Sequence, residues 1–223
     1  MEERLNHFEY NNLLFKRLVP IYDLVAVSLR AIRNDIIKNI NLKPGSKVID
    51  LACGTGTQAI KLAQNGHVVT GIDISPDMVS RAKRKNKGAN NPVFKIKNAT
   101  KTSYPESSFD VSIISFALHD MPHSMRREVI KEAKRVTRPN GKIVIVDYSK
   151  HSNRVTRKLL YYLTKTWESR YYDNFLDKGL DYYLRQENML SGVKKNYFWG
   201  EVEMIVSLNK KAGEIVAPHE KII

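Results

Sequence analysis

Apolar residues follow two alternating patterns through most of this chain. Short apolar runs, typical of strands buried in a parallel sheet, alternate with stretches in which apolar residues recur every three or four positions, as on one face of a helix. The runs predict strands at residues 47–51, 68–74, 92–96, 109–116 and 142–148, and the helical spacing predicts helices at 58–64, 76–87 and 123–136. Ser75 or Asp77 is placed to cap the second of these helices. This order indicates a doubly wound α/β sheet with its ligand site at the carboxyl ends of the strands.

The pattern changes at both ends of the chain. Residues 4–18 and 23–40 have helical spacing, with Pro20 and Pro44 as breaks, and predict extra N-terminal helices. Residues 154–183 are helical in tendency and rich in aromatic side chains. Residues 193–199 and 202–208 flank Gly200-Glu201 and predict a terminal antiparallel hairpin, which brings the expected sheet to seven strands. We expect one domain over residues 1–210, with a helical cap at 1–42, a helical aromatic insertion at 152–191 and a tail at 211–223.

The turn after the first strand carries the candidate chemistry, in the stretch Val48-Ile-Asp-Leu-Ala-Cys-Gly-Thr-Gly-Thr57. Gly54 and Gly56 let the backbone turn sharply and approach a ligand closely. The free N–H groups at the start of the next helix attract a carboxylate or a phosphate. Asp73 follows about 20 residues later, where an acid accepts hydrogen bonds from ribose hydroxyls. This order of parts predicts a pocket for a nucleoside cofactor.

Two classes of cofactor share this layout. The run from Gly54 to Ala59 nearly satisfies the dinucleotide pattern G-x-G-x-x-G/A. Asp50, at the tip of the first strand, would repel a pyrophosphate but would suit a cation such as the ammonium group of an amino acid. The stretch Asp50-Leu-Ala-Cys-Gly-Thr-Gly56 therefore resembles motif I of the class I S-adenosylmethionine-dependent methyltransferases, with Ala52 in place of the usual first glycine.

Further segments resemble the same superfamily. Gly71-Ile-Asp-Ile-Ser75 is similar to its motif II, and Ser108 to His119 is similar to its fourth strand and the following loop. Asn98 stands where the family often has an acid that binds the adenine amino group, and an amide oxygen still accepts that bond. The resemblance implies a Rossmann-like fold, S-adenosylmethionine as cofactor and S-adenosylhomocysteine as product. The cofactor-binding residues that it implies are Asp50, Ala52, Cys53, Gly54, Gly56, Asp73, Ile74, Asn98, Ala99 and Ser115.

Within this superfamily the chain most resembles the C-methyltransferases of ubiquinone and menaquinone biosynthesis. The resemblance rests on Tyr22-Asp-Leu, on the Ala52 form of motif I, and on the stretch from Arg135 to Ser149, which is similar to R-V-x-K-P-G-G ending in E-x-S. Asp147 replaces the glutamate of that stretch. The resemblance implies methyl transfer to a small hydrophobic acceptor such as a quinone precursor.

Methyl transfer from a sulfonium is an in-line displacement. It requires that donor and acceptor be held collinear, about 3 Å apart, with water excluded. The chemistry demands no metal, but a hydroxyl or aromatic-carbon acceptor requires a base. His119, in the loop after the fourth strand, is the expected base, flanked by Asp120 and His123. The other candidate catalytic residues are Asp147, at the end of the fifth strand, and Tyr22.

An aromatic cluster follows the fifth strand. Its side chains either form a lid over a flat or lipid-like acceptor or pack as an amphipathic helix against the sheet. The i, i+4, i+8 spacing of Trp167, Tyr171 and Phe175 favours packing for those three. The full set is Tyr161, Tyr162, Trp167, Tyr171, Tyr172, Phe175, Tyr182 and Tyr183.

The formal net charge of +14 is consistent with nucleic acid or an anionic membrane as a partner. Residues 81–101 hold eight Lys or Arg and no acid, but they are expected to spread over a helix, a loop and a strand. We therefore rank a small-molecule acceptor ahead of RNA, of a phospholipid or amine at an anionic membrane, and of a non-catalytic cofactor-binding protein. The lone Cys53 excludes internal disulfides. A cytoplasmic location and a monomer or homodimer are the expectations.

Overall fold

The computed structural model describes residues 29–87, 91–149, 171–189 and 192–210. Within these ranges a seven-stranded sheet has the order β3-β2-β1-β4-β5-β7-β6. The strands are β1 (Lys47–Leu51), β2 (Val68–Asp73), β3 (Val93–Ile96), β4 (Phe109–Ser115), β5 (Thr137–Tyr148), β6 (Val193–Tyr197) and β7 (Val202–Leu208). Strands β1 to β5 pair in parallel, and β7 lies antiparallel between β5 and β6. This confirms the predicted parallel sheet with a terminal antiparallel hairpin.

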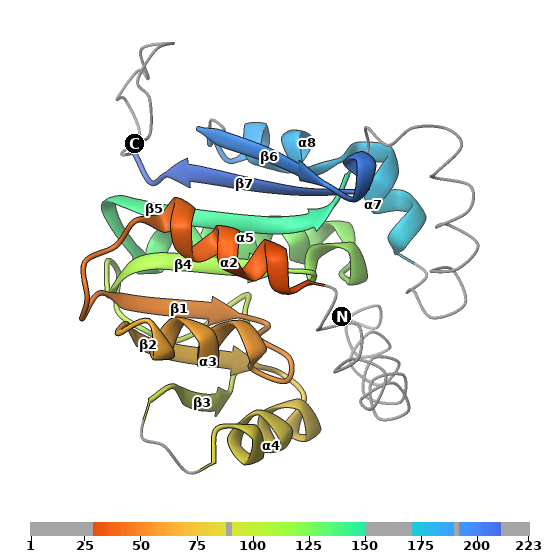
Figure 1. The fold of residues 1–223 in the computed structure, drawn as a ribbon. Coiled ribbons are helices and arrows are strands. Elements are labelled where there is room, and N and C mark those ends of the chain that lie inside the picture. The colour runs from red at the N-terminus through yellow and green to blue at the C-terminus, as the bar shows by residue number, and fades with distance from the viewer. Residues whose placement is uncertain (1–28, 88–90, 150–170, 190–191, 211–223) are drawn as a thin grey trace.

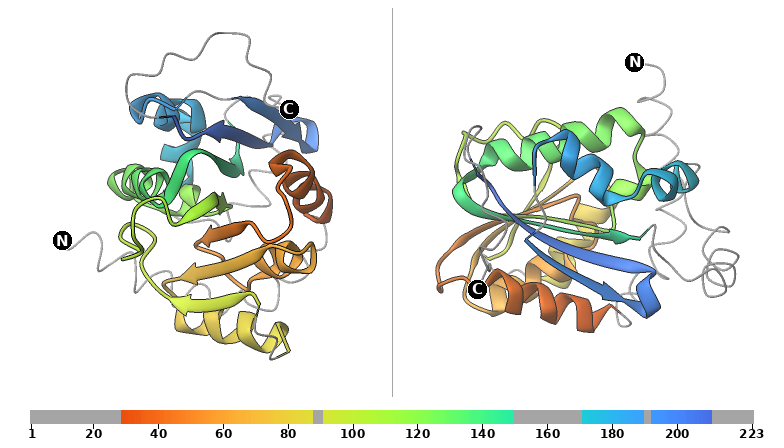
Figure 2. Two further views of the ribbon diagram at one scale, coloured as in Figure 1. Left: turned by 90° about the vertical axis from the view of Figure 1, so that its left-hand side faces the viewer. Right: turned by 90° about the horizontal axis from the view of Figure 1, so that it is seen from above.

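Helices cover both faces of this sheet (Figure 2). One face carries α2 (Arg30–Ile40), α3 (Thr57–Gln64) and α4 (Pro76–Lys85), and the other carries α5 (His123–Val136), α7 (Tyr172–Lys178) and α8 (Leu180–Gln186). Successive strand residues point to opposite faces. Ile113 of β4 therefore joins the apolar core under α2 and α3, and Ile114 joins the core under α5. Each face of the sheet thus has its own apolar core.

The first four elements after residue 46 lie close to their predicted positions; they are β1, α3, β2 and α4. The hydroxyl of Ser75 accepts a hydrogen bond from the backbone N–H of Met78, and Pro76 occupies the first turn of α4. Ser75 is therefore the cap of this helix, as one of the two predicted candidates. Helix α5 and strand β7 have the predicted bounds, because their apolar spacing is uninterrupted.

Three elements differ from the prediction. Strand β5 begins at Thr137 rather than at residue 142, because Thr137 pairs with Phe109 before an irregularity in the register. Strand β6 ends at Tyr197, and a 3₁₀ turn, η2 (Phe198–Gly200), leads into β7. The described part of the predicted long aromatic helix is two short helices, since Gly179, with φ 73°, separates α7 from α8.

The carboxyl ends of β1, β2, β4 and β5 point to one edge of the sheet, at the right in Figure 1. We call this the carboxyl edge. In the part of the chain that the structure describes, no helix has the length and apolar character needed to cross a bilayer. Tyr22, Tyr161, Tyr162, Trp167 and the tail at 211–223 lie outside the described residues, so the predicted cap, insertion and tail stay predictions.

Candidate functional site

The glycine turn, residues 52–56, joins β1 to α3 through three residues in the left-handed region. Ala52 has φ 57°, Gly54 has φ 53° and Gly56 has φ 72°. A Cβ at Gly56 would lie 2.5 Å from Cζ of Phe94, so this glycine allows the turn to pack against β3. A Cβ at Gly54 would meet no atom within 4 Å. The backbone at Gly54 therefore borders open space at the carboxyl edge, where a ligand can approach it.

Asp73 connects the end of β2 to the glycine turn. Its Oδ2 accepts a hydrogen bond from the backbone N–H of Gly54 at 2.8 Å, and its Oδ1 accepts one from the N–H of Ser75 at 2.9 Å. Burial raises the pKa of Asp73 above its usual value, and these two backbone donors act against that rise. The next side chain, Ile74, is apolar yet 40% exposed. An acid beside an exposed apolar residue suits a ribose with its base.

Asp50 lies at the end of β1 and is only 2% exposed. Its carboxyl group accepts a hydrogen bond from the backbone N–H of Ala59, but its Oδ2 has no partner. Burial, followed by the nearby carboxylate of Asp73, raises the pKa of Asp50 to about 7. A buried carboxyl oxygen without a donor fits a cationic group. Together with the open backbone at Gly54, it makes these residues a fit for the amino-acid end of S-adenosylmethionine.

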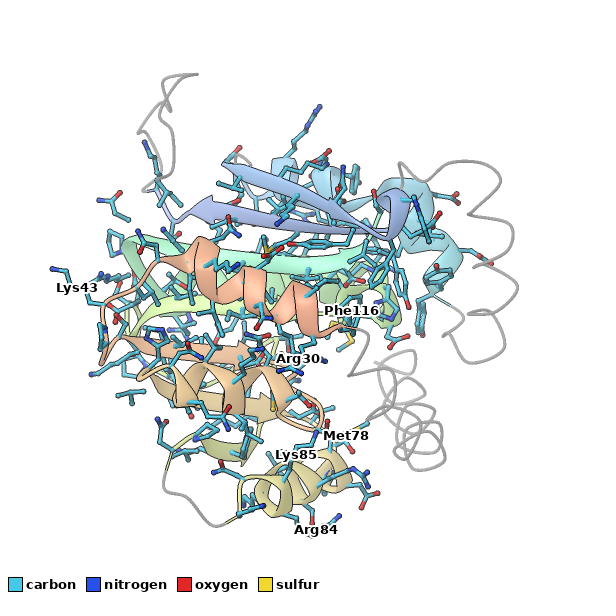
Figure 3. All side chains as sticks on the ribbon, viewed as in Figure 1. Arg30, Lys43, Met78, Arg84, Lys85 and Phe116 are labelled. Atoms are coloured by element: carbon cyan, nitrogen blue, oxygen red, sulfur yellow. The ribbon has the colours of Figure 1, made fainter. Side chains whose placement is uncertain are left out.

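Lys85 of α4 braces the glycine turn from the side. Its ammonium group donates to the hydroxyls of Thr55 and Thr57 at 3.1 and 2.7 Å, and it is labelled with Met78 in Figure 3. The sequence showed Lys85 only as part of the basic run. The contact gives that part of the run a role in the fold.

Three of the other predicted cofactor residues lie near the same edge. Ala99 is buried and Ser115 is half-buried at the end of β4. The Oδ1 of Asn98 accepts hydrogen bonds from the backbone N–H and the hydroxyl of Thr100, both at 2.9 Å. A carbonyl oxygen has two lone pairs, so this one is fully used. The predicted bond from the adenine amino group would require one of these bonds to open.

Cys53 follows Ala52 in the turn and is half-buried. Burial raises the pKa of its thiol well above the usual value, and the carboxyls of Asp50 and Asp73 raise it further. A thiol that stays protonated is a poor nucleophile. The placement favours a packing role for the Cys53 side chain over a nucleophilic one.

His119 and Asp147 form a buried pair at the carboxyl edge. His119 lies in the 3₁₀ turn η1 (Leu118–Asp120) and is 3% exposed. Its Nδ1 is 2.6 Å from Oδ1 of Asp147, and Oδ2 of Asp147 accepts a hydrogen bond from the backbone N–H of Leu118 at 2.9 Å. Its Nε2 lies 3.4 Å from Oδ2 of Asp120. The pairing of β4 with β5 thus brings two predicted site residues together across 28 positions of sequence.

Aromatic rings surround this pair. The centroid of the Tyr148 ring lies 4.8 Å from that of His119, and the rings of Tyr172 and Phe175 lie at 6.1 and 6.4 Å. Phe116, which directly follows β4 and is labelled in Figure 3, has its ring edge to face with that of Tyr148. Phe175 is fully buried, which agrees with packing, whereas Tyr148 is half-buried and lies at the end of β5. The imidazole is therefore buried between two carboxyl groups and a set of aromatic rings.

Sequence reasoning missed Arg126, a fully buried arginine of α5. Its Nε donates to the carbonyl of Leu118 at 2.9 Å, and its Nη1 donates to the hydroxyl of Tyr183 at 2.5 Å. The remaining donors reach Oδ1 of Asn174 and the carbonyl of Tyr171. The guanidinium also lies over the Phe175 ring, 5.1 Å from its centroid. Arg126 therefore links η1, the turn that contains His119, to helices α7 and α8. In the sequence, the signal for a buried arginine was its position beside Met125 on the apolar face of α5.

His123, the second predicted histidine, lies apart from the pair. Its Nδ1 is 3.1 Å from the Tyr183 hydroxyl. Burial lowers the pKa of His123, and the charge of Arg126 lowers it further. Within the described residues its contacts are with α8, so the structure separates it from the candidate base.

The fold and the glycine turn define a class I S-adenosylmethionine-dependent methyltransferase. Residues 48–141 match the family described as a methyltransferase domain. The chain is 31% identical over 175 residues to the demethylmenaquinone methyltransferase of Oceanobacillus iheyensis. This alignment covers 74% of this chain and 70% of that protein. It is 29% identical over 189 residues to the enzyme of the same name from Halalkalibacterium halodurans, covering 80% and 76%. The chain belongs to the class I S-adenosylmethionine-dependent methyltransferases, in the group that includes the menaquinone and ubiquinone enzymes.

Solved structures share this fold. The PH0226 protein of Pyrococcus horikoshii has a TM-score of 0.63 at 21% identity, over 82% of this chain and 90% of that chain. Magnesium protoporphyrin IX methyltransferase of Synechocystis, crystallised with S-adenosylmethionine, has a TM-score of 0.56 at 18% identity, over 81% and 77%. At these identities the likeness concerns the fold, and it agrees with the sheet order described above.

Proposed function

We propose that this methyltransferase transfers the methyl group of S-adenosylmethionine to a small hydrophobic acceptor that resembles a quinone precursor. The observation that carries the proposal is the buried His119–Asp147 pair among aromatic rings, at the edge that also holds the glycine turn. The relatives named demethylmenaquinone methyltransferase support an acceptor of this class.

The cofactor end of the site would be held by residues of the first two strands. Asp50 would accept a hydrogen bond from the ammonium group, and Asp73 would accept bonds from the ribose hydroxyls in place of a backbone donor. Ile74 would pack against the base, and the exposed backbone of Gly54 would allow close approach. When bound, S-adenosylmethionine supplies an electrophilic methyl group on a sulfonium.

The acceptor end would use His119 as a general base. With Nδ1–H donating to Asp147, Nε2 keeps the lone pair that takes a proton from a phenolic hydroxyl of the acceptor. Asp147 fixes this tautomer, and Asp120, 3.4 Å from Nε2, stabilises the imidazolium that forms. Removing that proton would raise the electron density of the ring carbon, which would gain the methyl group as the bond from methyl to sulfur breaks and S-adenosylhomocysteine leaves. The hydrogen of that carbon would then restore the hydroxyl, so that one proton, held by His119, is released for each methyl group transferred. Tyr148 is placed to contact a flat acceptor.

The test combines cofactor binding with turnover. Labelled methyl transfer from S-adenosylmethionine to reduced, prenylated naphthoquinones should be measured for the wild type and for His119→Ala. We expect His119→Ala to lower kcat by about 10²–10⁴-fold, the usual contribution of a general base. Its calorimetric affinity for S-adenosylhomocysteine should equal that of the wild type. Undiminished turnover by His119→Ala would remove the base from the mechanism, and no transfer to any lipid-soluble phenol would remove the acceptor class.

We expect the basic charge to serve the fold more than a polyanionic partner. Lys85 braces the glycine turn, and Lys142 donates to the carbonyl of Ile40 at 3.0 Å. RNA and anionic membranes stay the alternatives that the charge of +14 suggests. Sedimentation with RNA and with anionic vesicles at low salt separates them, because electrostatic binding falls steeply as salt rises. The oligomeric state, monomer or homodimer, stays a prediction for size-exclusion chromatography.

A further inference from the structure

Gln58, in the first turn of α3, buries a side-chain amide that has no hydrogen-bond partner. The residue is 5% exposed, and both Oε1 and Nε2 are unpaired. Buried polar atoms almost always have a partner, so such an atom needs an explanation. Oδ2 of Asp50 is a second buried atom of this kind, eight positions earlier.

The two residues lie at the same junction of β1 with α3. The carboxyl group of Asp50 accepts a hydrogen bond from the backbone N–H of Ala59, so it lies against the first turn of α3, where Gln58 is the residue before Ala59. The neighbouring hydroxyls of Thr55 and Thr57 are occupied by Lys85. The unpaired groups of this junction therefore combine a carboxyl oxygen with an amide that offers a donor.

Packing gives no reason for an amide at this position. Gln58 shares its face of α3 with Ala59 and Leu62, which are fully buried in the core beneath α2 and α3. A leucine or methionine has a similar volume and would leave no polar atom unpaired. The amide is thus unfavourable to the protein without a ligand, and a bound group that accepts from it would offset this cost.

The amino-acid end of S-adenosylmethionine presents the matching groups, an ammonium and a carboxylate on one carbon. We propose that Gln58 binds the carboxylate through Nε2, next to the ammonium held by Asp50. The free N–H groups and the positive end of the dipole at the start of α3 favour a negative charge there. The proposal rests on the cofactor assignment given above, and it adds a ligand contact to a residue that the family resemblance did not mark.

Two ligands and two matched variants test the contact by isothermal titration calorimetry. S-adenosylhomocysteine carries the amino-acid end, and 5′-methylthioadenosine is the same nucleoside thioether without it. We expect Gln58→Leu to weaken S-adenosylhomocysteine binding about tenfold or more, the effect of losing a hydrogen bond to a charged group. Binding of 5′-methylthioadenosine should change less than about twofold, and the free variant should melt at a higher temperature than the wild type. Gln64→Leu, at an exposed position of the same helix, should change neither affinity.

The outcomes separate the proposal from the cofactor assignment. Unchanged S-adenosylhomocysteine affinity in Gln58→Leu would overturn the contact and leave the assignment standing. A wild type that binds neither ligand would overturn both. If Gln58→Leu does not fold, Gln58→Glu takes its place. Its negative charge should weaken S-adenosylhomocysteine more than 5′-methylthioadenosine, and an equal effect on the two ligands would overturn the contact.

Discussion

The cofactor half and the acceptor half of the carboxyl edge treat buried polarity in opposite ways. At the end of β1 and the start of α3, Asp50 and Gln58 bury atoms without partners. On the other face of the sheet, Arg126 is buried just as deeply, and its donors reach carbonyl, amide and hydroxyl oxygens. The first region gains its missing partners from a ligand, whereas the guanidinium of Arg126 already has acceptors on η1, α7 and α8 before any ligand binds. The contrast indicates that cofactor binding is linked to stability, while the base is preorganised.

Replacing Arg126 should have the largest effect on this contrast. Arg126→Met keeps the aliphatic length but removes the guanidinium hydrogen bonds to the carbonyls of Leu118 and Tyr171, which keep one backbone donor each. Since the arginine is fully buried, we expect a loss of about 3–5 kcal/mol in the free energy of unfolding. Urea denaturation measures this loss. At temperatures where the variant stays folded, kcat should fall while the affinity for S-adenosylhomocysteine is retained.

Arg126→Lys supplies the control. A lysine keeps the charge, but it lacks the planar guanidinium whose donors reach acceptors on η1, α7 and α8 at the same time. It should recover part of the stability and little of kcat. If both variants lost cofactor affinity in proportion to stability, the two halves would be one cooperative unit and the contrast would fail.

The next largest effect concerns pH and Asp50. In the folded protein the pKa of Asp50 is about 7, against an ordinary value of 3.8, because burial and the Asp73 carboxylate disfavour the charged form. The folded state therefore holds a proton that the unfolded state has released, so the stability of the free protein falls as pH rises from about 4 to about 7. Between pH 5 and pH 8 this one group should remove up to about 2–3 kcal/mol.

Asp50→Asn should lose that dependence and be more stable than the wild type at pH 8. Chemical denaturation of both proteins at pH 5 and pH 8 gives the difference directly. Cofactor binding should run in the opposite direction, because the ammonium prefers the ionised carboxyl group. Wild-type affinity for S-adenosylhomocysteine should rise with pH up to about 7, and Asp50→Asn should bind weakly throughout. Equal pH slopes for the two proteins would show that Asp50 is ionised in the free state.

The sequence predicted the cofactor half better than the acceptor half, for a physical reason. The glycine turn, Asp73 and the cap at Ser75 are local features, in which spacing along the chain determines spacing in the fold. His119 and Asp147 were predicted separately at one edge, but their 2.6 Å contact depends on the register between β4 and β5. Arg126 has acceptors on a 3₁₀ turn and on the segment containing α7 and α8, up to 57 positions away, which no local pattern encodes.

The smallest effect concerns Ala52, which tests how far the cofactor half is strained without its ligand. Its φ of 57° lies in the left-handed region, which costs a residue with a Cβ roughly 1–2 kcal/mol. Ala52→Gly removes this cost, but it loses the contact of the methyl group with the core under α5 and adds about 0.5–1 kcal/mol of backbone entropy to the unfolded state. We expect a net gain of about 0.5 kcal/mol in the free energy of unfolding, measured by urea denaturation.

Gly54→Ala, two residues on at φ 53°, is the matched control and should lose about 1 kcal/mol in the free energy of unfolding. Because its new Cβ would enter the open space beside the turn, it should also weaken S-adenosylhomocysteine binding. If Ala52→Gly were less stable than the wild type, packing of the methyl group would outweigh the backbone strain. The turn would then hold no net strain in the free protein, and this part of the contrast with the acceptor half would fail.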